Sequence, residues 1–196
     1  MKNSILLVLS TAAAIAGPPL ICHPVDIGNA KSQPWKDDGK NWNGAVPHYN
    51  IDKLASDTLA ILTPAAPLAV RMETLRRAAI YAAKSDTAAE KLTARLVARI
   101  ADAEAAGKPD SNLWFDAGYF VEGLRQIGFV YKYNMLSQAE RAEWKVRGEA
   151  PGLDGKPWIE RAIRLGGKGM EVALAKIDEY RQADLKASKV VVSSAK

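Results

Sequence analysis

Apolar residues recur at steps of three and four along most of the chain after residue 50, which is the spacing of amphipathic α-helices. One such stripe comprises Leu68, Met72, Leu75, Ala79 and Ala82. The next comprises Leu92, Leu96, Ile100 and Ala103. Short polar turns separate these segments, so consecutive helices are expected to pair as antiparallel hairpins. We find no run of alternating apolar and polar residues, and the predicted fold is therefore all-α: an antiparallel helical bundle or a helical-hairpin array.

Capping residues predict where several helices begin. Asn50 precedes the first apolar stripe and is a favourable N-cap. Thr87 followed by Glu90 has the spacing of a capping box, and so does Ser137 followed by Glu140. These signals predict helices that start just after residues 50, 87 and 137.

The segment from about residue 111 to residue 127 is apolar around most of a helical circumference, which predicts a helix at the centre of the fold. Its polar side chains project over one arc of about 120° at 100° per residue. We call four of them the polar strip: Asp116, Tyr119, Glu122 and Gln126. The strip is expected to reach solvent or a cavity, and its members are candidate ligand-binding or partner-binding residues.

The first sixteen residues have the layout of a secretory signal peptide. Lys2 precedes a short apolar run, small residues follow, and the pattern around Ala16 suits signal peptidase, so the mature chain is expected to start at Gly17. The run is shorter than the about 20 apolar residues of a membrane-spanning helix. We therefore predict a periplasmic or secreted protein, with no transmembrane segment after the signal is removed.

Residues 17–49 differ in composition from the rest because five prolines and four glycines interrupt any helix. The same stretch carries Trp35, Trp42 and several aliphatic residues, too much apolar surface for a free linker. We expect a Pro/Trp-rich extended arm that packs on a helical domain at residues 50–186. Residues 187–196 are expected to form a flexible tail.

Composition limits the classes of function. Of the residues, 48% are hydrophobic and 25% are charged, as in an ordinary globular protein. The net charge of +5 is spread among both signs without a block of like charges, so no nucleic-acid partner is expected. No cofactor-binding glycine motif occurs, and no cofactor is expected.

The single cysteine, Cys22, excludes an internal disulfide. Cys22 and His23, with Asp26 nearby and His48 further on, are the only collection of classical metal-ligand types and a candidate for weak copper or zinc binding. A structural cysteine beside a polar histidine is the favoured interpretation, because the close ligand pairs of a strong site do not occur. A lipid anchor on Cys22 is the less favoured alternative, because Ile21 stands where lipoprotein processing needs a small residue.

Two functions are compatible with these patterns. The favoured one is a non-enzymatic protein-interaction or scaffold protein of the cell envelope or extracellular space, which binds a protein partner through the polar strip or through Trp35 and Trp42. The alternative is an envelope hydrolase, or a protein that binds a small ligand or glycan, with a cleft lined by carboxylates and aromatic rings. Glu73, Asp116 and Glu122 are the candidate acids of such a cleft.

Overall fold

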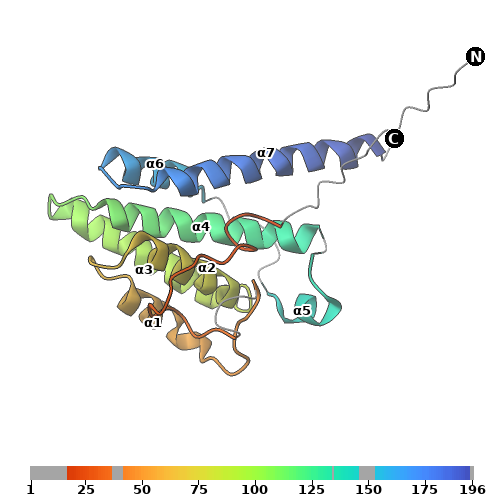
Figure 1. The fold of residues 1–196 in the computed structure, drawn as a ribbon, viewed down its shortest axis with the longest axis horizontal. Helices are drawn as coiled ribbons and strands as arrows, with labels where there is room; N and C mark the ends of the chain where they lie inside the picture. The colour runs from red at the N-terminus through yellow and green to blue at the C-terminus, as the bar shows by residue number, and fades with distance from the viewer. Residues whose placement is uncertain (1–16, 37–41, 134, 146–152, 195–196) are drawn as a thin grey trace, which may run out of the picture.

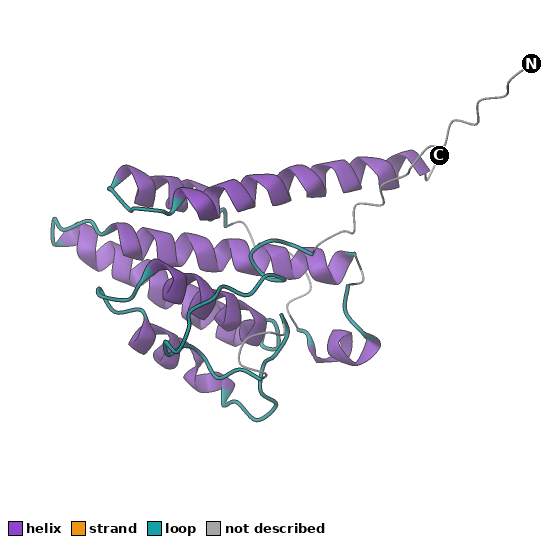
Figure 2. Ribbon diagram, in the orientation of Figure 1, coloured by secondary structure: helices purple, strands orange, loops and turns teal. Residues whose placement is uncertain are grey.

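The computed structural model describes residues 17–36, 42–133, 135–145 and 153–194, and the predicted all-α class is confirmed for them (Figures 1 and 2). These residues contain no strand, and a single antiparallel bridge joins Trp35 to Ala45. A short 3₁₀ helix at Ile51–Lys53 leads into α1. The helices are α1 (Leu54–Ile61), α2 (Leu68–Ala82), α3 (Asp86–Ala105), α4 (Ser111–Lys132), α5 (Gln138–Glu143), α6 (Lys156–Arg164) and α7 (Glu171–Ser194).

Helix α4 lies in the middle of the molecule, in agreement with its nearly continuous apolar surface. In Figure 1, α2 and α3 lie on one side of α4, and α6 and α7 lie on the other. The side chains of Phe115, Phe120 and Ile127 are completely buried at this position. Burial of one such side chain stabilises the fold by roughly 1.5–3 kcal/mol, so α4 organises the core.

The helix starts follow the capping residues with one correction. Asn50 accepts a hydrogen bond from the Asp52 backbone N–H at 3.1 Å, and Ser137 forms the expected capping box with Glu140. The predicted box at residues 87 and 90 is wrong, because α3 already begins at Asp86. Ser85, whose backbone is extended, accepts from the Ala88 N–H and is the cap. An extended backbone is what an N-cap requires, and residue 87 lies inside the first helical turn.

The chain ends differ from the sequence-based expectation in one respect. Helix α7 continues to Ser194, eight residues beyond the predicted end of the helical domain at residue 186. The flexibility predicted for residues 187–196 stays a prediction. The predicted signal peptide, residues 1–16, lies outside the described residues and also stays a prediction.

None of the helices in the described part of the chain has the length and apolarity needed to cross a membrane.

Residues 17–36 and 42–50 lie against α2 and α4. Leu20 and Ile21 are buried, and both of their backbone N–H groups donate to Gln126 Oε1 of α4, at 2.8 and 3.3 Å. Further along, the Tyr81 hydroxyl of α2 donates to the Pro34 carbonyl at 2.6 Å and accepts from the Val46 N–H at 3.0 Å. Polar side chains of the helices therefore supply hydrogen-bond partners for the backbone N–H and C=O groups of a segment that has no regular secondary structure of its own.

Candidate functional site

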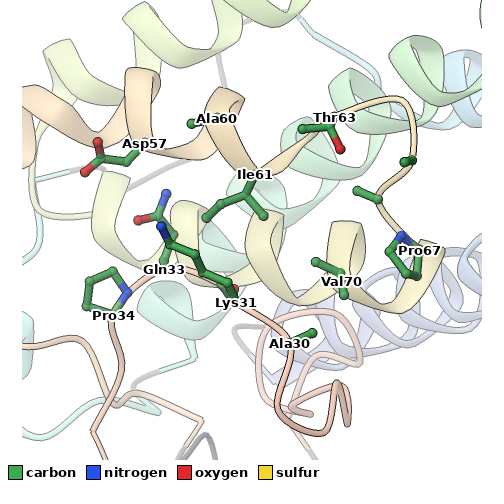
Figure 3. Close-up of a pocket in the computed structure, with 13 residues that line it drawn as sticks. Ala30, Lys31, Gln33, Pro34, Asp57, Ala60, Ile61, Thr63, Pro67 and Val70 are labelled. Atoms are coloured by element: carbon green, nitrogen blue, oxygen red, sulfur yellow. The ribbon is translucent and has the colours of Figure 1, made fainter.

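A pocket of about 570 Å³ lies between the N-terminal segment and the first two helices (Figure 3). Residues 30–34 form one wall, α1 and the α1–α2 loop form the other, and the start of α2 closes the base. Its lining is mainly small and apolar: Ala30, Pro34, Ala60, Ile61, Ala65, Ala66, Pro67 and Val70. Its polar members are Lys31, Ser32, Gln33, Asp57 and Thr63. A volume in this range is typical of small-ligand binding pockets.

The most unusual polar group of the pocket is the amide of Gln33. The residue is 1% exposed, and its Nε2 donates to the Thr58 hydroxyl at 2.8 Å. Its Oε1 is buried and has no hydrogen-bond partner among the described residues. An unpaired buried acceptor costs about 1–3 kcal/mol, so this oxygen favours any ligand that brings a hydrogen-bond donor.

Two groups of opposite charge complete the polar lining. Asp57 accepts a hydrogen bond from the Tyr49 hydroxyl at 2.8 Å, which fixes the carboxylate on α1. Lys31 is exposed, and its side chain extends toward the Gln33 amide in the view of Figure 3. Because the two charges cancel, the pocket does not select strongly for an ion of either sign.

Two arginines behind the pocket hold the α1–α2 loop in place. Arg71 of α2 donates through Nε to the Ala66 carbonyl at 3.2 Å and through Nη2 to the Thr63 carbonyl. Arg99 of α3 donates to the Leu62 carbonyl at 3.2 Å. Arg71 also donates through Nη1 to Asp116 Oδ2 at 2.7 Å. One wall of the pocket is thus tied through Arg71 to the polar strip of α4.

Asp116 is 0% exposed, which corrects the expectation that the polar strip reaches solvent. Burial raises the pKa of its carboxyl group to about 7 from an ordinary 3.8, although the neighbouring charges of Arg71 and Arg99 act in the opposite direction. A raised pKa is one property of a catalytic acid. The second property, access to a substrate, requires an opening that this carboxyl group does not have.

We expect the Asp116→Asn variant to change how stability depends on pH. The native carboxyl group keeps its proton to about pH 7 and the unfolded one only to about pH 4, so the native state binds more protons between these values. Wild-type stability should therefore fall relative to the variant as pH rises through this window, by at most about 1.4 kcal/mol per pH unit.

Urea unfolding of both proteins at several values between pH 4 and pH 8 measures this difference. The other titrating groups are shared by the two proteins, so their contributions cancel in the comparison. Asp102→Asn on the exposed face of α3 is the control for the loss of one acidic residue. A wild-type advantage that grows with pH would contradict the raised pKa.

The remaining members of the polar strip are also buried, and they do not come together in one site. Glu122 accepts hydrogen bonds from Arg181 of α7 at 2.8 Å and from the Gly155 N–H at 3.0 Å. Gln126 binds the N-terminal segment, and Tyr119 packs against Phe115 with 5.3 Å between ring centroids. Asp116 faces α2 and Glu122 faces α7, which are on different sides of α4 in Figure 1. Their proposed role in ligand binding stays a prediction.

Glu73 was a candidate acid of a cleft, and the structure places it in a buried ion cluster. Its carboxylate accepts from Arg76 at 2.7 and 2.8 Å, from Arg77 at 2.6 Å and from the Val25 N–H at 2.9 Å. Burial by itself would raise the pKa of Glu73, but the hydrogen bonds and charges of these partners lower it overall. We call Glu73, Arg76 and Arg77 the α2 ion cluster.

The α2 ion cluster also holds the N-terminal segment. Arg76 donates to the carbonyls of Ile21 at 3.0 Å and Trp42 at 2.8 Å, and Arg77 donates to the carbonyl of Gln33 at 2.8 Å. The last of these bonds fixes the backbone of the residue whose amide lines the pocket.

The two tryptophans predicted to contact a partner are half-buried. The Trp35 ring lies 4.9 Å from the Arg76 guanidinium and 5.3 Å from that of Arg77, and its edge meets Tyr81. Trp42 packs against the core. Neither lines the pocket of Figure 3. Partner binding through these rings stays a prediction, and the cation–π contacts of Trp35 give the ring an internal role.

Cys22 and His23 lie close to Gly17, the first residue that the structure describes. Burial raises the pKa of the Cys22 thiol to about 12, which opposes the thiolate form that metals bind. His23 is exposed, and its Nε2 donates to the Gly17 carbonyl at 3.3 Å. Within the described ranges no group of three potential ligands for a metal ion is found. Weak metal binding by this pair stays a prediction.

The sequence analysis did not identify the residues that line the pocket of Figure 3. Gln33 and Lys31 carry no motif, and Asp57 is one of many helical carboxylates. The pocket depends on a loop from the N-terminal segment crossing two helices, and no local pattern reports such a crossing. Comparisons of the chain with protein-family models, with curated proteins and with solved structures find no match.

Proposed function

We propose that this chain is a non-enzymatic protein-interaction protein that works outside the cytoplasm. In this proposal, residues 17–49 form an arm that packs on an array of helical hairpins, and a partner binds where the arm and the array meet. The observation that carries the proposal is the pocket of about 570 Å³ between residues 30–34, α1 and α2, whose lining is mainly small and apolar.

The positions of the acidic residues support binding over hydrolysis. Glycoside hydrolysis needs two carboxyl groups that face one substrate across a cleft. The three candidate acids instead form ion pairs with arginines: Glu73 with Arg76 and Arg77, Asp116 with Arg71, and Glu122 with Arg181. Each has a side chain that is 0% exposed. Asp116 and Glu122 thus connect α4 to other helices, and Glu73 binds the N-terminal segment through the Val25 N–H, so all three carboxylates have structural contacts.

Site-specific photocross-linking in the native host tests this function. A photoreactive phenylalanine derivative at Ala60, an exposed position of α1 that lines the pocket, is expected to cross-link one discrete protein. The same derivative at Ala94, exposed on α3, is the matched control and is expected to give no such product. Identical cross-linking patterns from both positions, or no cross-link at either, would contradict the proposal.

The proposed location has its own test. Mass spectrometry of the protein purified from the periplasm or the medium is expected to give an N-terminus at Gly17, within a few residues. A purified native protein that retains Met1 would exclude export by a cleaved signal peptide. A diacylated Cys22 would instead establish a lipid anchor.

A further inference from the structure

We propose that the pocket of Figure 3 binds an extended peptide segment of the partner protein, which seats one small aliphatic side chain and donates a backbone N–H to Gln33 Oε1. This inference rests on the proposed protein-binding function and names the chemistry of the ligand. It is carried by two independent observations: the apolar cavity and the unpaired buried acceptor in its wall.

The lining of the pocket indicates which kind of side chain it would bind. Alanines and prolines form much of both walls, and Ile61 of α1 and Val70 of α2 add larger aliphatic side chains. Such a surface stabilises an aliphatic group at roughly 25 cal/mol per Å² of buried apolar area. The cavity of about 570 Å³ is several times larger than one leucine side chain, so it has room for an aliphatic side chain together with the peptide backbone on either side of it.

The unpaired oxygen sets the polar chemistry. Gln33 is held from both sides, because its carbonyl accepts from Arg77 and its amide nitrogen donates to Thr58. The amide therefore keeps its orientation, and Oε1 needs a donor from elsewhere. A peptide supplies an N–H beside every side chain, so it can satisfy this oxygen and fill the apolar cavity at the same time.

Access to the oxygen requires a neighbouring side chain to move, because Oε1 is buried. The Lys31 side chain extends toward the Gln33 amide in the view of Figure 3. Lys31 is exposed, so it can rotate away at a small cost in side-chain entropy. Asp57 on the opposite wall and Lys31 give the pocket no net charge, which suits the uncharged backbone of a peptide.

Selection from a displayed library of random twelve-residue peptides, with the full chain as bait, provides the probe. A selected peptide is then synthesised with a fluorescent label, and its Kd is measured by fluorescence anisotropy. Ala60→Arg places a long cation at the mouth of the pocket from an exposed position and is expected to weaken binding at least tenfold. Ala94→Arg adds the same charge on α3 and is expected to leave the Kd unchanged.

N-methylation of the peptide, one backbone nitrogen at a time, identifies the donor to Gln33. One position is expected to weaken binding to the wild type at least tenfold, and to have little effect on Gln33→Met, which lacks the acceptor. Because this comparison is made within each protein, a loss of stability in Gln33→Met does not imitate it. Circular dichroism verifies that the variant is folded.

The outcomes separate the ligand chemistry from the proposed function. If no selected peptide loses affinity with Ala60→Arg, or if N-methylation affects the wild type and Gln33→Met equally, the peptide inference is wrong. A discrete cross-link at Ala60 in the same case would leave the protein-binding function standing, with a folded surface as the partner. Peptide binding in vitro without any cross-link in the host would support the pocket chemistry and contradict the proposed role in the cell.

Discussion

Replacing Glu73 by glutamine is expected to lower the free energy of unfolding by about 3–5 kcal/mol. Glu73 is the only acid in the α2 ion cluster, and its carboxylate accepts hydrogen bonds from Arg76 and Arg77. The side chains of Glu73 and Arg76 are 0% exposed and that of Arg77 is 11% exposed. The variant would leave two buried guanidinium groups without a counter-charge, which costs far more than the loss of one neutral hydrogen bond.

Urea unfolding followed by circular dichroism measures this change. Glu90→Gln is the matched control, because it makes the same substitution at an exposed position of α3 and is expected to alter the free energy by less than about 0.5 kcal/mol. Limited proteolysis adds a local measure: the variant should be cut faster within residues 20–36, because Val25, Ile21 and Gln33 all bind the cluster. Equal stabilities of the Glu73 and Glu90 variants would rule out the cluster as a major source of stability.

Gly155→Ala is expected to lower the free energy of unfolding by about 3 kcal/mol, at the upper end of the cost of overpacking. A Cβ atom at this position would lie 2.2 Å from the Gly118 carbonyl oxygen and 3.1 Å from Cγ of Glu122. The first neighbour is backbone of α4 and cannot rotate away. Helices α4 and α6 would have to move apart, which would also weaken the hydrogen bond from the Gly155 N–H to Glu122.

The comparison with Gly107→Ala isolates the steric cause. Gly107 has φ +66°, and an added Cβ there meets no atom within 4 Å. Its substitution therefore carries only the cost of a left-handed backbone, about 1–2 kcal/mol. Gly155 has φ −80°, which alanine adopts without strain. Thermal or urea unfolding that finds Gly155→Ala no more damaging than Gly107→Ala would show that α4 and α6 are not in close backbone contact.

The helices themselves could be predicted from the sequence, because their signals are local. Apolar side chains three and four residues apart share one helix face, and caps such as Asn50 and Ser137 act within three residues. The central position of α4 followed from the same kind of pattern, since a helix that is apolar on most sides needs neighbours on most sides. The one wrong cap, Thr87 in place of Ser85, was an error of two residues in an otherwise correct helix start.

The candidate site could not be predicted in the same way. The polar strip was expected to reach solvent or a cavity because its side chains share one arc of the helix. Its residues are buried because partners arrive from distant parts of the chain: Arg71 is 45 residues from Asp116, and Arg181 is 59 residues from Glu122. No helical periodicity encodes which arginine will meet which carboxylate.

The sequence by itself determined the helical segments, most of their ends and the apolar faces that form the core, since these depend on residues within a few positions of one another. The tertiary structure alone decided which polar groups are buried, and where a pocket remains between the N-terminal segment, α1 and α2. The reason is physical: much of the burial and pairing depends on contacts between distant parts of the chain, as in the pair of Arg71 and Asp116, which are 45 residues apart. Such contacts exist only once the helices have packed.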